Sequence, residues 1–411
     1  MSVNKIKFTN KLFIIFFFCL SMASLPTHES NSGETTYQYL IILIYSIFAL
    51  SMTIINSNNV IRERLSIRYI DFIPLIFICV WIYGVFIGLL RDIPNKYVFR
   101  NFAGMFVYSI YYIFVQQKLS FEIIKKACLF TSLLGIPVIF YYVYSNLSSG
   151  VLANFIIGER MIFCGLQLII FIPFCIAFGQ FFFPINTQDT KFFKNNFIIL
   201  LVGTITFFTS VIMSFSKGMI LSSISVVFII VMTKVLKNFN VKNILYVGIF
   251  LLIISGMLYY LDLFKLLGEL FSGQEVSNAT RNEQSTYIIS DLTFWGRGLG
   301  AGLSDSNYIR ADDAPYAFEL TYLNLIHKFG VFSLPLFFSY IYTFLLIIRV
   351  LGKSQRKNFV GLLCLGLMVY VFPSIGNPFL FSPLCVTLHC LTLIILKKEL
   401  YEKKLAVNAL K

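Results

Sequence analysis

Two charged side chains late in the chain have the chemical types that group transfer requires. Glu319 is a carboxylate among apolar neighbours, where a charge is costly unless it is paired or used. Arg281 follows Thr280 in a Thr-x-x-Glu capping-box pattern, which predicts a helix start with Arg281 in its first turn. A carboxylate can act as a general base on a sugar hydroxyl, and the arginine fork suits phosphate or pyrophosphate. Together they favour transfer between a hydroxyl and a phosphate-bearing group.

A glycine-rich segment lies between these two residues: Trp295-Gly296-Arg297-Gly298-Leu299-Gly300-Ala301-Gly302. Arg297 adds a second candidate contact for pyrophosphate. The pattern alone resembles a dinucleotide-binding loop, but no βαβ pattern surrounds it, so the nucleotide interpretation is dropped. A tight backbone turn is favoured over a binding loop. Trp295 suits either a membrane-interface anchor or a surface on which a sugar stacks.

A third segment predicts the helix that presents Glu319. Asp312-Asp313-Ala314-Pro315 supplies an N-cap and an early proline, and a helix from Tyr316 to Lys328 would end at Gly330. One face of this helix would carry Tyr316, Glu319, Tyr322 and Leu323. Tyr322 is therefore a candidate glycan contact. The alternative for Glu319 is a purely structural ion pair with Lys328 or Arg310.

Three further cations are expected on the same outward side of the membrane: Arg100, Arg160 and Lys217. Snorkelling to the membrane surface would explain any one of them alone. As a set beside Glu319, in a chain whose surroundings disfavour charge, they favour a substrate pathway.

Neither a metal site nor a cofactor is predicted from the sequence. The chain has 3 histidines, none close to another in sequence, and its 8 cysteines all lie in apolar stretches without paired spacing. The cysteines are therefore interpreted as small hydrophobic residues.

The elements that position these residues follow from the composition. Of the 411 residues 58% are hydrophobic, 46 are phenylalanine and 13% are charged, which is about half the usual charged fraction. Lipid must therefore be the solvent. Counting stretches of about 20 apolar residues predicts an all-α protein with about twelve transmembrane helices, at 12–26, 37–57, 72–90, 101–117, 127–147, 161–184, 196–215, 218–233, 244–261, 331–349, 359–375 and 378–396.

The charges fix the expected orientation. With both termini cytoplasmic, each inward loop is basic and most acidic residues face outward, as the positive-inside rule requires. The net charge of +14 is then a topology signal, and nucleic acid is excluded as a partner. The first span could instead be a signal peptide cleaved near Ser21-Met22-Ala23.

The expected spans divide the chain into three parts. Transmembrane helices occupy 1–261, a large outward loop occupies 262–330, and the last helices with a basic tail occupy 331–411. A loop of this length usually has a function. Its opening residues, 262–271, predict a helix lying on the membrane surface.

This pattern resembles the bacterial O-antigen polymerase and ligase superfamily, whose members are membrane glycosyltransferases. Ser216-Lys217-Gly218 is similar to the family's Ser-Arg-Gly, with lysine as a point charge in place of the bidentate arginine. Arg281 and the glycine run resemble the family's arginine helix and glycine turn. Residues 319–330 match the helix before a late span, and Asn377-Pro378 is a further family feature. Ligases usually carry His-Asn where this chain has Glu319-Leu320, whereas polymerases often carry Glu.

The resemblance implies an O-antigen polymerase with a GT-C-like fold in the bacterial inner membrane. It would join undecaprenyl-pyrophosphate-linked repeat units on the periplasmic side without a metal or cofactor. Glu319 would act on the acceptor hydroxyl, and the cations Arg281, Lys217, Arg160 and Arg100 would hold the leaving pyrophosphate. Membrane lipid, a chain-length regulator and a flippase are the implied partners.

Two other functions remain open at this level. A ligase of the same superfamily would need the histidine that is absent here. A lipid-linked oligosaccharide flippase would also have about twelve spans, but it would carry charges within the spans rather than on one large loop. A non-catalytic membrane scaffold has no sequence feature in its favour.

Overall fold

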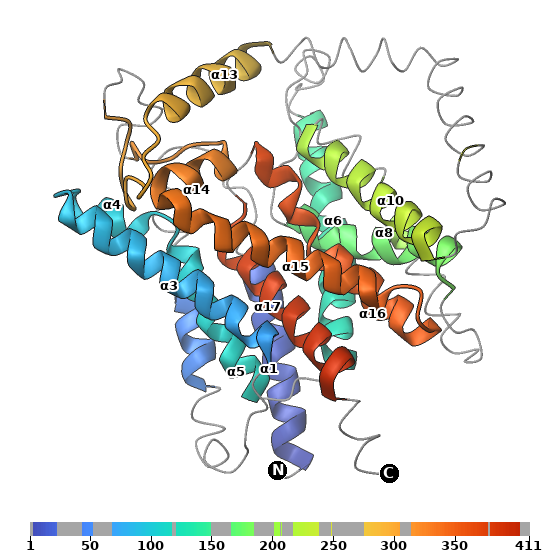
Figure 1. Ribbon diagram of the computed structural model, residues 1–411. Coiled ribbons are helices and arrows are strands. Elements are labelled where there is room, and N and C mark those ends of the chain that lie inside the picture. The colour runs from blue at the N-terminus through green and yellow to red at the C-terminus, as the bar shows by residue number, and fades with distance from the viewer. Residues whose placement is uncertain are drawn as a thin grey trace.

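The computed structural model describes residues 3–22, 43–51, 68–116, 121–148, 166–184, 201–205, 207, 217–237, 248, 275–304, 314–376 and 379–402 (Figure 1). Every regular element in these ranges is helical. The named elements are α1 (Val3–Met22), α3 (Tyr69–Leu90), α4 (Asn95–Arg100), η1 (Ala103–Ser109), α5 (Ile110–Gln116), α6 (Phe121–Ser148), α8 (Leu166–Phe182), α10 (Lys217–Lys237), α13 (Glu275–Ser290), α14 (Thr321–Phe329), η2 (Gly330–Ser333), α15 (Leu334–Val350), α16 (Gln355–Leu367), η3 (Val369–Val371), η4 (Pro373–Ile375), α17 (Pro383–Lys397) and η5 (Lys398–Glu402).

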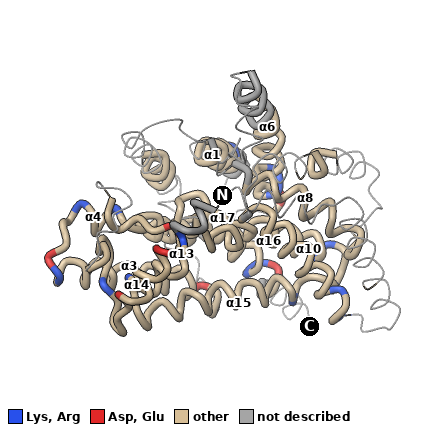
Figure 2. Tube along the Cα trace, turned by 90° about the horizontal axis from the view of Figure 1, so that it is seen from above, with Lys and Arg blue, Asp and Glu red and all other residues tan. Residues whose placement is uncertain are grey.

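Four helical stretches in the described residues are long and apolar enough to cross a membrane. They are Tyr69–Leu90, Gly218–Lys237, Thr321–Val350 and Gln355–Ile375. Shorter apolar helices occupy Asn10–Ser21, Ala103–Val115 and Leu168–Phe182. An all-helical membrane protein is thus the class that the fold defines, and Figure 2 shows that most of the described helical body carries no charged residue. The count of twelve spans stays a prediction, and most of the expected spans 37–57, 196–215 and 244–261 lie outside the described residues.

Two expected spans are interrupted. In the stretch 101–117, Phe102 takes a left-handed conformation with φ of 50°, and the 3-10 helix η1 precedes the short α5. Gly104 lies directly against the backbone carbonyl of Phe381, so this break brings η1 close to the segment before α17. In the stretch 359–375, α16 ends at Leu367 and continues as η3 and η4.

The core lies around α8, α16 and α17. Every residue of α16 from Asn358 onward and every residue of α17 after Pro383 is buried, which is typical of an innermost helix. Glycines permit the closest helix contacts: a Cβ at Gly366 would lie 2.8 Å from the Cα of Ile172. Small residues of this kind allow backbones to approach within a membrane.

The two ends of the bundle differ. The start of α1 and the end of η5 lie at one end, the bottom of Figure 1, while α4, α13 and α14 lie at the other. At the first end, Lys397 donates to both carboxylate oxygens of Asp71 at 2.8 and 2.9 Å, and Tyr111 donates to the same carboxylate at 2.5 Å. The buried ion pair joins the end of α17 to the start of α3. The opposite end carries the loop residues singled out by the sequence.

Candidate functional site

An ion pair joins the two residues expected to carry the chemistry. Nε of Arg281, on α13, donates to Oε2 of Glu319 at 2.8 Å, and the two side chains are 18% and 23% exposed. Glu319 lies in a bend just before α14, and α13 packs against α14 (Figures 1 and 2). The structure therefore brings Arg281 and Glu319 together at the loop end of the apolar bundle.

The local elements differ from the sequence prediction in two ways. The helix carrying Arg281 begins at Glu275 rather than Thr280, because residues 275–279 contain no glycine or proline to stop it. The next helix begins at Thr321 rather than Tyr316, so Tyr316 and Glu319 are not on its face. The expected opening helix at 262–271 lies outside the described residues.

The late start of α14 has a visible cause. The side-chain oxygen of Gln284 accepts hydrogen bonds from the backbone N–H groups of Glu319 (3.0 Å) and Leu320 (3.2 Å). Leu320 is the N-cap of α14 and its apolar side chain cannot cap. Gln284 fills part of that role from α13, and the sequence reasoning missed it. Its position three residues after Arg281, on the same helix face, is the signal that could have found it.

The end of η4 lies against the Arg281–Glu319 ion pair. A Cβ added to Gly376, at the end of η4, would lie 3.7 Å from both Cζ and Nε of Arg281, so the guanidinium lies against this glycine. Tyr322 donates its phenol hydrogen to the carbonyl of Val371 at 2.6 Å, which ties α14 to η3. Tyr322, three residues after Glu319 in the chain, is thus engaged with the backbone beside η4.

The helix α10 brings Lys217 towards this end of the bundle. It packs against η3 and η4, and its last residue, Lys237, contacts Gly352 in the turn between α15 and α16. Since α16 runs from that turn to η4, α10 runs antiparallel to it and begins on the η4 side. Lys217 is the first residue of α10. The outward location expected for Lys217 stays a prediction.

The remaining predicted cations have separate locations. Arg100 is the last residue of α4, half-buried, and α4 packs against the end of α3. Arg160 lies outside the described residues. Arg297 is engaged by Asp291: its Nη2 lies 2.5 Å from Oδ1 of Asp291, and its Nε donates to the Asp291 carbonyl at 3.1 Å.

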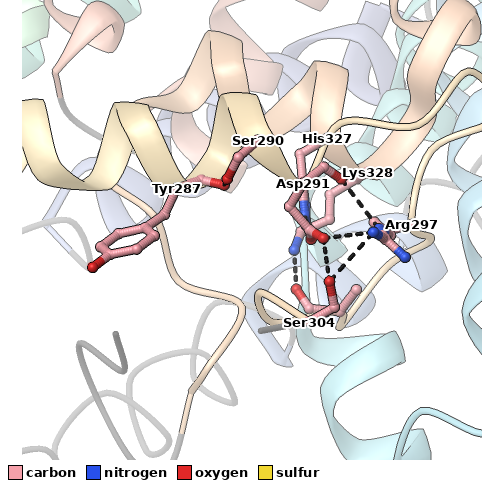
Figure 3. Close-up of polar contacts among 8 residues, drawn as sticks. Tyr287, Ser290, Asp291, Arg297, Ser304, His327 and Lys328 are labelled. Atoms are coloured by element: carbon pink, nitrogen blue, oxygen red, sulfur yellow. Dashed lines mark hydrogen bonds and ion pairs between the residues drawn. The ribbon is translucent and has the colours of Figure 1, made fainter. Parts of the chain in front are cut away.

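Asp291 is the centre of a second polar cluster, which the sequence reasoning did not identify (Figure 3). Its carboxylate also accepts hydrogen bonds from Ser304 and from Nε2 of His327, the latter at 2.8 Å. Burial raises the pKa of Asp291, but the hydrogen bonds from Ser304 and His327 and the charge of Arg297 outweigh burial and leave that pKa below its ordinary value. The cluster joins the end of α13, the glycine segment and α14. No sequence pattern links these residues, because they come from three separate segments.

The glycine segment is a close-packed turn. Gly296, Gly298 and Gly300 have φ between 78° and 82°, a conformation that favours glycine. A Cβ at Gly298 would collide with the backbone of Gly88 on α3. Backbone N–H groups of the turn donate to α14 and α3, from Gly298 to Lys328 at 2.9 Å and from Leu299 to Gly84 at 2.9 Å. The prediction of a tight turn is confirmed.

Lys328 is not the partner of Glu319. It is fully buried on α14, where its ammonium donates to the carbonyl of Ala301 and lies 4.6 Å from the ring centre of Phe318. The alternative that paired Glu319 with Lys328 is therefore wrong, because α14 directs Lys328 towards the glycine turn. Arg310, the other partner considered, lies outside the described residues.

Trp295 is 58% exposed beside Phe294, which is 67% exposed. It stacks on Phe332 with ring centres 6.1 Å apart, and its carbonyl accepts from Tyr83 at 2.7 Å. This position suits either the interface anchor or the sugar-stacking role.

No protein-family model matches this chain, and no curated protein matches it. Within the described ranges, no three histidine, cysteine or acidic side chains gather in a way that could hold a metal ion. The site is defined by its geometry alone: an arginine–glutamate pair at one end of an apolar helical bundle, held by α13, α14 and η4.

Proposed function

We propose that this protein is an O-antigen polymerase of the bacterial inner membrane. It transfers a growing glycan from undecaprenyl pyrophosphate to the terminal sugar of another lipid-linked repeat unit on the periplasmic side. The observation that carries the proposal is the Arg281–Glu319 pair, partly exposed at the loop end of a bundle with four described helical stretches long and apolar enough to cross a membrane. Both substrates have lipid tails, so a site at this level lets their polar groups meet while the tails stay in lipid.

The pair supplies the two functions that glycan transfer needs. The acceptor hydroxyl attacks the anomeric carbon of the donor sugar, and the bond from that carbon to the pyrophosphate oxygen breaks. Glu319 takes the proton from the hydroxyl. Arg281 stabilises the negative charge that develops on the leaving pyrophosphate.

The bonding of Arg281 suits this role. Among the described residues, its contact with Glu319 is made through Nε, which leaves the terminal nitrogens of the fork to take pyrophosphate oxygens. A pyrophosphate that draws Arg281 towards itself also weakens the hold of Arg281 on Glu319. Donor binding therefore weakens this ion pair before the carboxylate meets the acceptor hydroxyl.

The other predicted site residues are assigned to two different roles. Lys217 and Arg160 are assigned to the pyrophosphate, with Arg100 as a further candidate. Arg297 and Tyr322 are engaged with Asp291 and Val371, and we assign them to holding the site in shape. A direct contact of either with the glycan stays a prediction.

The lipopolysaccharide profile of a deletion strain, with and without the restored gene, tests the proposal. The expected result is core carrying a single repeat unit, with the ladder of longer chains returning on complementation. Loss of every repeat unit would instead indicate a ligase or a flippase. Polymerised lipid-linked glycan in the periplasm would then identify the ligase, and unpolymerised glycan on the cytoplasmic face would identify the flippase. An unchanged ladder would exclude a role in O-antigen synthesis.

A further inference from the structure

The backbone at Glu319 is held by one side chain from another helix. Glu319 and Leu320 precede α14, where N–H groups have no partner within the helix. Both donate to the side-chain oxygen of Gln284, at 3.0 and 3.2 Å. Gln284 is 1% exposed, so this amide is shielded from water. The location of the Glu319 backbone therefore depends on α13.

The same helix also holds the carboxylate. Arg281 and Gln284 are three residues apart on α13 and so lie on one face. Arg281 contacts the side chain of Glu319 while Gln284 contacts its backbone. When a bound pyrophosphate draws Arg281 away, the contact made by Gln284 is unaffected, because it involves only the main chain.

From this geometry we infer that Gln284 is a positioning residue, which keeps Glu319 in place for the acceptor hydroxyl once Arg281 has turned to the pyrophosphate. The inference rests on the proposed function. Gln284 itself touches neither substrate nor the reacting atoms. Its loss lowers the rate of the chemical step rather than the binding of the lipid-linked substrates.

Four variants of the full-length protein, purified in lipid nanodiscs, separate this role from a general effect on folding. Gln284→Met keeps the side-chain length but removes the acceptor, whereas Gln284→Glu keeps oxygens that can accept both hydrogen bonds. Glu283→Met changes the exposed neighbour on the same helix. Ile288→Ala shortens a fully buried apolar side chain of α13 one turn further on.

Two readouts are needed. Amide hydrogen exchange of the peptide containing Glu319 and Leu320 reports directly on their two hydrogen bonds to Gln284, whatever reaction the protein catalyses. We expect roughly ten-fold faster exchange in Gln284→Met and no change in Glu283→Met. Steady-state transfer with a synthetic polyprenyl-pyrophosphate repeat unit should show kcat lowered about 10- to 100-fold with KM within about two-fold. Gln284→Glu should restore most of the rate.

Several results would overturn the inference. Unchanged exchange in Gln284→Met would show that the amide does not hold Glu319. Faster exchange with an unaltered kcat would show that the hydrogen bonds to Gln284 are irrelevant to the reaction. A loss of kcat in Ile288→Ala equal to that in Gln284→Met, at the same thermal stability of the two variants, would show that Gln284 has only a structural role. A wild-type protein that transfers no glycan would instead overturn the proposed function, with the exchange difference still present, so the two failures are distinguishable.

Discussion

At the scale of single residues, the setting of Glu319 distinguishes it from an ordinary surface carboxylate. It is about one quarter exposed, paired with Arg281 and held at its backbone by Gln284. Surface ion pairs contribute little to stability, typically less than about 1 kcal/mol. This pair is partly shielded and joins α13 to the segment before α14. A role in the proposed reaction therefore explains it better than a contribution to stability does.

Glu319→Gln tests this role with a nearly isosteric change. Glutamine keeps an oxygen for Arg281 but cannot take a proton from a hydroxyl, so polymer should be almost completely lost. Membrane insertion and protein level should stay normal, because the main-chain contacts with Gln284 are retained. The measurement is the lipopolysaccharide ladder of a complemented deletion strain, with an immunoblot of the membrane fraction as the control. Full-length polymer from this variant would remove Glu319 from the mechanism.

Asp291 allows a prediction about pH. Its pKa in the folded protein lies below the ordinary value near 4. Its ionised form therefore contributes stability that is fully present above that ordinary value and is lost as the pH falls through the folded pKa. Asp291→Asn should lower stability by about 2 kcal/mol at pH 7 and weaken the fall in stability below pH 4. Thermal unfolding of both proteins in detergent across pH 3–7 measures this, and equal pH profiles would contradict it.

At the scale of elements, the sequence predicted helices where an apolar stretch must be helical in lipid. It did not predict helix boundaries that go with contacts between residues far apart in the chain. The apolar stretches beginning near 72 and 218 form α3 and α10, because a segment that crosses lipid must hydrogen-bond its backbone N–H and C=O groups internally. The break at Phe102 and the late start of α14 escaped detection, since each occurs beside a contact with a residue remote in sequence, Phe381 beside Gly104 and Gln284 beside Glu319.

The candidate site shows the same division. The types and order of Arg281 and Glu319 were readable from the sequence, and the structure joins them. The contributions of Gln284 and Gly376 were missed: the spacing of Gln284 from Arg281 was its one signal, and a glycine carries no chemical signal until the fold places it.

The glycine turn gives a prediction at this scale. Gly298 has φ of +82°, and a Cβ there would collide with the backbone of Gly88. Gly298→Ala should therefore lower stability by about 3 kcal/mol through strain and a forced separation of the turn from α3. Gly302→Ala is the matched control, because its φ is not in the left-handed region and its Cβ would meet Pro315 at 3.4 Å, an ordinary contact. Thermal unfolding in detergent compares the two. Equal stability would show that the turn is not tightly packed on α3.

At the scale of the whole molecule, the described structure is an apolar helical body with its polar site at one end. The start of α1 and the end of η5 lie at the opposite end (Figure 1). The positive-inside rule, applied to the basic inward segments expected from the sequence, predicts that this opposite end is cytoplasmic. The proposed reaction therefore requires α13 to face the periplasm, because the assembled lipid-linked units are joined there.

Cysteine labelling tests that orientation independently of catalysis. Thr286→Cys lies on an exposed position of α13, and Gln355→Cys lies on an exposed position at the start of α16, beyond the far end of the helical stretch Thr321–Val350 that begins beside Glu319. A membrane-impermeant maleimide applied to cells with a permeabilised outer membrane should label the first variant, and should label the second only after the inner membrane is broken. Wild-type protein supplies the background from its own cysteines. The opposite pattern would put Arg281 and Glu319 in the cytoplasm, where a periplasmic polymerase cannot work, and the site would then have to act on a substrate made or consumed on the inner face.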